Sequence, residues 1–479
     1  MSELHHDVRQ RTDIPRADTP QNLYGELDES VDKIGITPAH YKIFTLVALG
    51  SLFNAVEEYN VGYAAPHIVK QWNVSQFSIG LLSAVTFIAM AVGSLISGVV
   101  GDRMGRRLIF MVNLAVFTFG ALLAAVAPSY EVLLLARILV GIGLGGEISL
   151  GYTVVSEMVP TRQRGPMTSA LNFVASGIGV FAASGLAALM LGPLLPALGG
   201  EEMAWRWFFG VMFLPALLIL FYRRYLPETP RYLLRRGEVD ATNRVLSILA
   251  SGRLRASKTL TITRYLSVPD GTRPSVEVGT SAGLSALFHR SIVRSTVVGW
   301  MLTLLIFGGF VVLNIFMPTV LVARGFDIGT SLALSTIINI GGLCGGLAGM
   351  VASGRVPRRI MFTVAPLLAV VLMVCFAVTS NSIITVVTAA GVTAAFQASS
   401  ATLWAYLPEL FPTRLRALGT GSCATVGLLV AGVLPLLAGA LLDAFGTVGI
   451  YVLIGGLCLA VPGVAMLGRE TFGRALDES

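Results

Sequence analysis

Four ionisable residues lie within segments that are otherwise almost wholly apolar. Glu57 and Glu58 are adjacent in FNAVEEYNVG, whereas Arg137 begins RILVGIGLGGE and Glu147 ends it. An ionised side chain at the centre of a bilayer costs about 2.5–3.5 kcal/mol or more, so such residues are by default functional. Two carboxylates and a guanidinium in such a setting could carry a proton, hold a charged solute or form an ion pair.

The two adjacent glutamates cannot share one role equally. Neighbouring residues of a helix point about 100° apart, so Glu57 and Glu58 cannot face one cavity equally well. A static glutamate–arginine pair that only holds helices together is the structural alternative. Glu147 follows Gly145 and Gly146, and we expect it to support packing or gating rather than direct proton transfer.

A second group of charges separates the apolar segments and occurs twice. GVVGDRMGRR at 98–107 is matched by MVASGRVPRR at 350–359, so that Arg103 and Arg355 differ by 252 positions (355 − 103 = 252). SEMVPTRQRG at 156–165 and PELFPTRLRA at 408–417 share this offset. The second copy has Gly354 and Pro357 where the first has aspartate and glycine, which predicts a stronger network in the N-terminal half.

These loops predict ion pairs that form a gate at one face, because planar guanidinium groups suit shared carboxylates. The alternative is that the charges only anchor the topology. The predicted gate consists of Asp102, Arg103, Gly105, Arg106, Arg107, Glu157, Arg162, Arg164, Arg355, Arg358, Arg359, Glu409, Arg414 and Arg416.

The elements that carry these residues must be long and apolar. Of 479 residues, 54% are hydrophobic and 13% are charged, with a mean hydropathy of +0.76. A soluble domain has about 25% charged residues. Runs such as 81–100 and 384–403 approach the ~20 residues of a membrane-spanning helix, and the ~10-residue alternating segments of a membrane barrel are not seen. The fold class is therefore an all-α membrane protein.

The apolar runs number twelve, six on each side of a polar, basic stretch. The predicted units are a cytoplasmic tail with a short juxtamembrane helix at 1–41, a six-helix bundle at 42–226, a cytoplasmic linker at 227–290, a second six-helix bundle at 291–468 and a cytoplasmic tail at 469–479. Arginines gather in alternate connections, which places both termini of a plasma-membrane protein in the cytoplasm. This distribution explains the net charge of +7 and disfavours nucleic-acid binding.

No nucleophile–base pair, metal-ligand cluster or phosphate loop is apparent in the sequence, so we expect no enzyme, no cofactor and no metal site. Gly141, Gly143, Gly145 and Gly146 lie inside an apolar helix and predict close helix packing rather than a nucleotide loop. The expected partners are a small organic solute, protons and the lipid bilayer, and the expected state is a monomer.

Several motifs resemble those of one transporter family. GVVGDRMGRR is similar to the loop 2–3 signature of the major facilitator superfamily, and RILVGIGLGGE to its fourth-helix signature. LPETPRYL at 226–233 and ETFGRAL at 470–476 resemble marks of the sugar-porter and organic-ion branch. The stretch from DKIGITPAHYKIF to SLFNAVEEYNVG looks most like niacin, aromatic-acid and synaptic-vesicle-protein-like members. The resemblance implies two pseudo-symmetric six-helix bundles that rock about a central site.

The resemblance also implies roles for the charges. Glu57 takes the second acidic position of the family's first helix, which implies a proton-coupling pair with Arg137, and Glu58 is the less favoured alternative. In the family, charged loops of this kind latch the outward-facing form.

The polar residues within the apolar segments indicate the class of solute. Sugar porters place glutamines on helices 5 and 7, where this chain has Asn172 and the pair Gly308–Gly309, so we do not expect a sugar. We expect a proton symporter of a carboxylated or aromatic metabolite such as niacin or a benzoate. An organic-cation or drug carrier, or a proton antiporter, is the first alternative, and a transport-inactive receptor-like protein is the second. The candidate binding residues are Tyr63, Asn172, Asn314, Asn339 and Trp404.

Overall fold

The computed structural model describes residues 20–254, 261–266, 284–412 and 415–471, and the regular elements of these ranges are all helices. The first half contains α2 (Pro38–Trp72), α3 (Gln76–Met104), α4 (Arg106–Ala125), α5 (Tyr130–Met158), α6 (Thr161–Phe173), α7 (Val180–Met190), α8 (Glu201–Gly210) and α9 (Ala216–Tyr225). The second half contains α12 (Val293–Ala323), α13 (Ile328–Ser353), α14 (Arg358–Val378), α15 (Ser382–Tyr406), α16 (Arg416–Phe445) and α17 (Thr447–Leu467).

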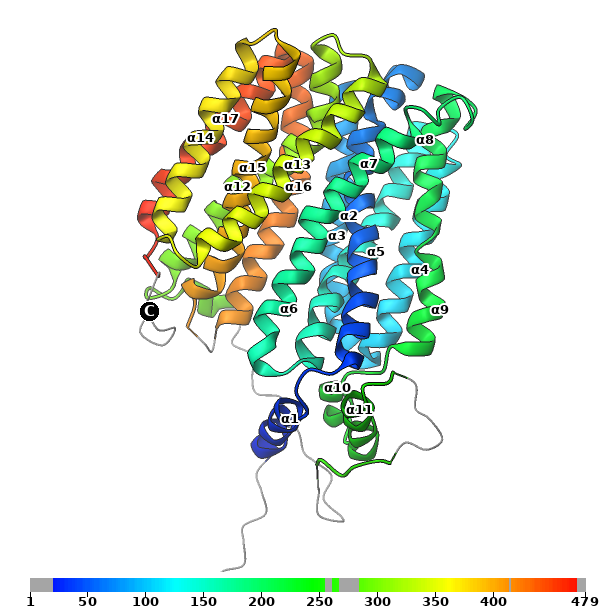
Figure 1. The fold of residues 1–479 in the computed structure, drawn as a ribbon, viewed down its shortest axis with the longest axis vertical. Coiled ribbons are helices and arrows are strands. Elements are labelled where there is room, and N and C mark those ends of the chain that lie inside the picture. Colours follow the sequence, from blue (N-terminus) through cyan, green and yellow to red (C-terminus); the bar gives the residue numbers. More distant parts are fainter. Residues whose placement is uncertain (1–19, 255–260, 267–283, 413–414, 472–479) are drawn as a thin grey trace, which may run out of the picture.

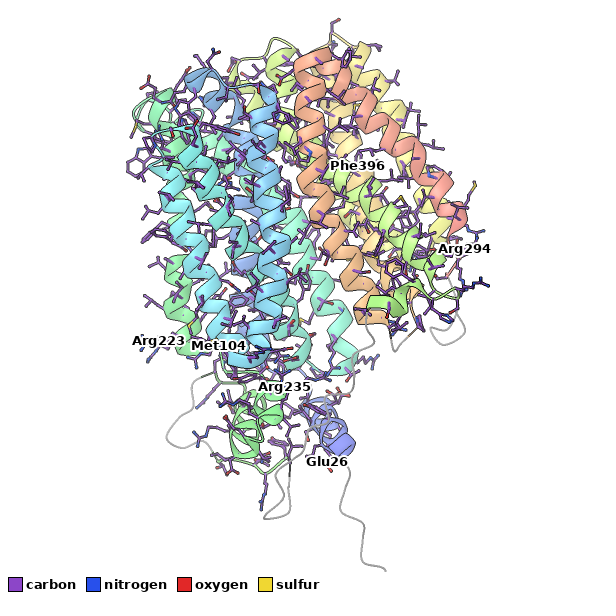
Figure 2. The ribbon with its side chains drawn as sticks, turned by 180° about the vertical axis from the view of Figure 1, so that it is seen from behind. Glu26, Met104, Arg223, Arg235, Arg294 and Phe396 are labelled. Atoms are coloured by element: carbon purple, nitrogen blue, oxygen red, sulfur yellow. The ribbon has the colours of Figure 1, made fainter. Side chains whose placement is uncertain are left out.

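Three short helices gather at one end of this bundle, below it in Figure 1. They are α1 (Pro20–Ile34), α10 (Pro230–Arg235) and α11 (Val239–Ser251). We call this the linker end and the other the opposite end. Arg223, Arg235 and Met104 all lie near the linker end, and Arg294 lies at the corresponding end of the second half (Figure 2).

Eleven helical segments of the described chain are long and apolar enough to cross a membrane. Two of them join shorter helices, α6 with α7 and α8 with α9. α2 is the twelfth long segment, and its lower hydropathy follows from its polar residues, which include Glu57 and Glu58. Its 35 residues far exceed the ~20 that cross a bilayer core. The predicted all-α membrane fold is therefore confirmed.

The two halves repeat each other in structure as well as in sequence. Gln76 begins α3 and Ile328 begins α13, and these positions differ by the same 252 residues (328 − 76 = 252). The capping residues also correspond, because Ser75 accepts a hydrogen bond from the backbone of Ser78 and Asp327 accepts one from Thr330. The offset found in the charged loops therefore extends to helix boundaries.

The halves meet along three helix pairs, in which α3 packs against α16, α7 against α13 and α2 against α12. At the opposite end, Asp443 of α16 accepts hydrogen bonds from the backbone nitrogens of Gln76 (3.0 Å) and Phe77 (2.9 Å). Contact between α3 and α16 continues to Ile88. Beyond it, apolar residues of α3 such as Leu95 are exposed. The halves are therefore packed together at the opposite end, and the part of α3 beyond Ile88 has exposed apolar side chains.

Within the first half, α3 and α5 approach closely through glycines. A Cβ atom on Gly93 of α3 would lie 2.1 Å from the carbonyl oxygen of Ile142, and one on Gly145 of α5 would lie 1.9 Å from that of Met90. No side chain fits at these distances, so the backbones are in direct contact. The close packing predicted from the glycines of this helix is seen here.

Replacing Gly93 by alanine should destabilise the protein, because the added methyl group must push α3 away from α5. Overpacking of this kind costs about 1–3 kcal/mol. The matched control is Gly98→Ala on the same helix, where a Cβ atom would meet nothing within 4 Å. Thermal unfolding of the purified protein in detergent should show a lower midpoint for Gly93→Ala alone. Equal midpoints for both variants would contradict this packing.

Candidate functional site

Glu57 of α2 and Arg137 of α5 form a salt bridge inside the first half, and both side chains are completely buried. Asn60 donates a hydrogen bond of 2.7 Å to the second oxygen of Glu57. Arg137 donates from Nε to the hydroxyl of Thr86 in α3 (3.1 Å), and its guanidinium carbon lies 6.0 Å from the ring centre of Phe209 in α8. Four helices thus surround the pair, and both charges have the partners that burial demands.

We expected the proton-carrying glutamate to face a central cavity, but Glu57 does not. Glu57 points into the first half, toward α5, because it lies about 120° around the helix from Tyr63. Glu58 is partly exposed, and its electrostatic neighbours are Tyr59 and Tyr152 rather than a cation. The two glutamates therefore have separate environments, as their adjacency on one helix predicts.

A central cavity lies between the halves. Tyr63 of α2, Asn314 of α12 and Asn339 of α13 line it, and Asn339 donates a hydrogen bond of 3.0 Å to the hydroxyl of Tyr63. Three of the five predicted binding residues therefore meet across the interface. The remaining lining residues, which the sequence did not single out, are Leu313, Met317, Ser335, Ile338 and Thr393.

The cavity is small, with a volume of about 10 Å³ that the centre of a water-sized molecule can occupy. Small-molecule sites usually measure roughly 300–1,000 Å³. A solute therefore needs movement of the lining side chains or of the two halves. The polar groups that face the space are amides and hydroxyls, and no charged side chain is among its lining residues in the described part of the chain.

The other two predicted binding residues do not line this cavity. Asn172 of α6 accepts a hydrogen bond of 3.3 Å from the hydroxyl of Tyr152. Trp404 packs at the linker end of the second half, against the apolar cluster around Tyr406 and Phe362. Helical periodicity identifies a face of a helix but not which neighbour covers that face, so Trp404 could not be placed from the sequence.

A further contact between the halves involves an irregular turn. Residues 174–179, between α6 and α7, form a π-helical segment, where the regular backbone pairing is interrupted. Gln397 of α15 donates a hydrogen bond of 2.9 Å to the carbonyl oxygen of Ser176 in this segment. Neither residue was singled out by sequence, because a π-helical turn has no signature there.

The repeated charged loops form matching ion pairs at the linker end. Arg106 pairs with Glu157 (2.7 Å) in the first half, and Arg358 pairs with Glu409 (2.8 Å) in the second. Asp102 adds further pairs in the first half, with Arg106 (3.3 Å) and with Arg235 of α10 (3.5 Å). These pairs lie within one half or connect it to α10. A stronger gate in the first half stays a prediction.

Two carboxylates that we did not include in the gate cap the helices that follow these loops. Glu228 accepts hydrogen bonds from the backbone nitrogens of Arg106 and Arg107 at the start of α4, and Glu470 accepts from those of Arg358 and Arg359 at the start of α14. A negative charge at a helix N-terminus satisfies free N–H groups and favours the helix dipole. Glu228 lies in the motif LPETPRYL and Glu470 in ETFGRAL. The two motifs could therefore have identified these helix caps from the sequence.

Gly105 has a positive φ of 105°, and a Cβ atom on it would lie 2.6 Å from a carboxylate oxygen of Glu228. Only glycine adopts this backbone conformation easily and also leaves room for the cap. The turn before α4 therefore depends on both properties.

The remaining gate candidates make backbone contacts or face solvent. The carbonyl of Arg103 accepts from the hydroxyl of Tyr232, the Arg107 side chain donates to the carbonyl of Arg223, that of Arg359 donates to the carbonyl of Gly468, and that of Arg416 donates to the carbonyl of Pro408. Arg162 and Arg355 are exposed. Arg414 lies outside the described residues.

Arg164, another gate candidate, contacts α1 instead of the charged loop. Its guanidinium pairs with Asp28 (2.8 Å), which also pairs with Arg231 of α10 (2.8 Å). Asp32 accepts a hydrogen bond of 2.6 Å from the backbone of Thr161, at the start of α6. α1 therefore connects the first half to the linker helices.

Burial by itself would raise the pKa of Asp28, but hydrogen bonds from Arg231 and Arg164 outweigh it and hold the pKa below its ordinary value of 3.8. The ionised carboxylate therefore stabilises the docked position of α1. This contribution is present above the pKa of the unfolded chain and is lost as the pH falls through the lower folded-state pKa.

The Asp28→Asn variant should show faster amide hydrogen exchange in α1 at neutral pH. Each partly exposed ion pair that is lost should lower the free energy of α1 docking by about 0.2–1 kcal/mol. At matched pH, the difference from wild type should shrink as the pH is lowered below about 3.8. Glu29→Gln is the control, because Glu29 pairs with exposed Lys33 on the same helix. A difference that is constant with pH would contradict the role of Asp28.

Comparison with known proteins agrees with this architecture. The family model for sugar (and other) transporters matches residues 41–479. The niacin transporter NiaP of Acinetobacter baylyi is 25% identical over 456 residues, covering 94% of this chain and 99% of that protein. The inner membrane metabolite transport protein YdjE of Escherichia coli is 25% identical over 461 residues, covering 95% of this chain and 98% of that protein.

Solved structures show the same fold. The inward open conformation of the xylose transporter XylE from Escherichia coli matches with a TM-score of 0.68 at 19% identity, covering 92% of this chain and 98% of that chain. The crystal structure of a D-xylose-proton symporter matches with a TM-score of 0.68 at 20% identity. The repeated six-helix halves, the paired charged loops and these matches lead to one conclusion: the chain is a multi-pass membrane protein of the major facilitator fold and belongs to the sugar (and other) transporter family.

Proposed function

We propose that the protein is a proton-coupled symporter that moves a small carboxylated or aromatic metabolite, such as niacin or a benzoate, by alternating access. The observation that carries this proposal is the buried pair of Glu57 and Arg137, whose two charges lie inside the first half with no solvent contact. Such a pair is costly to place in a membrane protein and is therefore a candidate for function rather than for stability.

The pair links proton binding to helix movement. A proton on Glu57 would remove its negative charge and leave the guanidinium of Arg137 buried without a counter-charge, which is strongly unfavourable. Proton binding and a shift of α2 against α5 therefore favour each other, as thermodynamic linkage requires. α2 also carries Tyr63 at the central cavity, so the same shift changes the site of the solute.

The cavity supports a small solute with a few polar groups. Asn339, Tyr63 and Thr393 offer amide and hydroxyl groups beside the apolar side chains of Leu313 and Met317. A carboxylate would be held by such neutral donors rather than by Arg137, whose hydrogen bonds go to Glu57 and Thr86. The 25% identity to the niacin transporter NiaP supports this class of solute without specifying the compound.

One observation favours a second candidate, an organic-cation carrier or proton antiporter. Glu58 is partly exposed, and its electrostatic neighbours are tyrosines, not cations. A carboxylate in this setting suits a cationic solute.

The membrane orientation follows from the distribution of charge. We infer that the linker end faces the cytoplasm, because arginines gather there in the loops before α4 and α14 and on α10. On this inference both termini are cytoplasmic and the membrane is the plasma membrane. We expect the transporter to act as a monomer.

Uptake of labelled niacin, 4-hydroxybenzoate, a quaternary amine and xylose into proteoliposomes tests the solute class. We expect accumulation of a carboxylated aromatic compound when the outside is more acidic than the inside. Accumulation driven by the reverse pH gradient would indicate an antiporter. Absence of counterflow for the whole panel would favour the receptor-like alternative.

Glu57→Gln should abolish accumulation driven by the proton gradient, because the amide cannot exchange a proton in the pair with Arg137. Counterflow of the same solute should persist, since it needs no net proton transfer. The matched control is Glu58→Gln on the adjacent position, which should retain gradient-driven uptake. If uptake survives in Glu57→Gln and fails in Glu58→Gln, the proton site is the other glutamate.

A further inference from the structure

A second buried carboxyl group lies further along α5. Glu147 is ten residues from Arg137, or about 15 Å along the helix axis toward the linker end. Its side chain is 2% exposed, and neither carboxyl oxygen has a hydrogen-bond partner among the described residues. This differs from Glu57, which has both Arg137 and Asn60 as partners.

The groups that surround Glu147 are neutral. A Cβ atom on Gly50 of α2 would lie 2.3 Å from Oε1 of Glu147 and 2.6 Å from the hydroxyl of Tyr222 in α9, so both groups share one small space. Tyr222 is the titratable group facing Glu147, and its hydroxyl donates to the carbonyl of Leu46 (3.0 Å). No charged side chain in the described part of the chain acts on Glu147.

The neighbouring helices add polar but uncharged groups. Ser97 of α3 and Asn113 of α4 lie beside Gly146, the residue next to Glu147, and are hydrogen-bonded to each other (3.0 Å). Gly50 of α2 and Tyr222 of α9 therefore lie close to the carboxyl group, and the Ser97–Asn113 pair lies beside the preceding residue of α5. The carboxyl group of Glu147 therefore has no counter-charge and accepts no hydrogen bond from the described residues.

Because an unpaired buried charge is strongly unfavourable, we propose that Glu147 holds a proton in this conformation and is a second proton-binding residue of the first half, separate from the pair of Glu57 and Arg137. The inference rests on the proposed proton coupling. It gives Glu147 a more direct part than the packing or gating expected from the sequence.

The proton can leave only when the site changes. Gly50 brings the backbone of α2 against the carboxyl group, so a movement of α2 away from α5 opens this space. Water that enters accepts the proton as the O–H bond breaks, and it then solvates the carboxylate. The same shift of α2 that separates Glu57 from Arg137 therefore also uncovers Glu147, which places two protonation events on one helix movement.

Infrared spectroscopy of the full chain in lipid vesicles tests the protonation state, with protons as the ligand and no solute. The spectrum of wild type minus that of Glu147→Gln should contain the carbonyl band of a protonated carboxylic acid at neutral pH. The band should disappear reversibly as the pH is raised. A missing band, or one that persists at every pH the protein tolerates, would overturn the proposal. Glu57→Gln is the matched control and should leave the band in place.

Transport measurements on Glu147→Gln and wild type distinguish a failure of this proposal from a failure of the proposed function. Glutamine has nearly the shape of a protonated glutamate, so Glu147→Gln should keep counterflow and lose gradient-driven accumulation of the panel solute that wild type accumulates. Accumulation equal to that of wild type would overturn the role of Glu147 alone. A wild type that accumulates nothing under a proton gradient would refute the proposed coupling, while the infrared result still decides whether Glu147 binds a proton.

Discussion

The arrangement of the first half depends on one constraint, the need of Arg137 for a counter-charge inside the membrane. The guanidinium carries its charge at every physiological pH, so the surroundings must adapt to it. α2 supplies Glu57, α3 supplies Thr86 and α8 supplies Phe209. Any event that weakens the contact of Glu57 with Arg137 therefore changes the packing of several helices at once.

Close backbone contact makes the rest of the half respond as a unit. Gly93 and Gly145 bring α3 and α5 together with no side chain between them, so these two helices cannot shift independently. α2 has more freedom, because its contacts with α5 at Glu57 and at Gly50 involve side chains that can change protonation state. It also borders α12 of the second half and carries Tyr63 at the central cavity. In the proposed function, α2 is thus the element through which proton and solute influence each other.

Each half has matching polar contacts at the linker end, and a further contact joins the halves at the opposite end. The pairs of Arg106 with Glu157 and Arg358 with Glu409 fix the same corner in each half, and Glu228 and Glu470 cap the helices that follow. These contacts keep each half rigid, while the contact of Asp443 with the start of α3 holds the halves together at the opposite end. Rigid halves joined at one end are suited to rocking about a central site.

Composition, spacing and motifs were enough to predict the twelve helices, the two repeated halves and a charged network around Arg106, whereas the pair of Glu57 with Arg137 was implied by the resemblance to a known family. These features were predictable because a charge in an apolar segment, or a motif at a fixed offset, restricts the possibilities. The direction of individual side chains was harder to predict from the sequence. Trp404 packs on a local cluster rather than at the cavity, and Gln397 reaches a carbonyl that a π-helical turn makes available. Such placements depend on which neighbour covers a helix face, and helical periodicity does not contain that information.

In the proposed mechanism, proton binding at Glu57 is linked to the movement of the two halves. Spin labels at Leu108 and Ile360 measure the distance between the halves at the linker end, and labels at Val126 and Val378 measure it at the opposite end. All four positions are exposed. The native cysteines would be substituted first. Pulsed electron resonance distances should change in opposite directions at the two ends when the pH is lowered. In Glu57→Gln the response to pH should be clearly smaller, and the part that remains should be lost when Glu147 is also replaced by glutamine. Distances that respond equally with and without Glu57, or that do not change in wild type, would contradict the account.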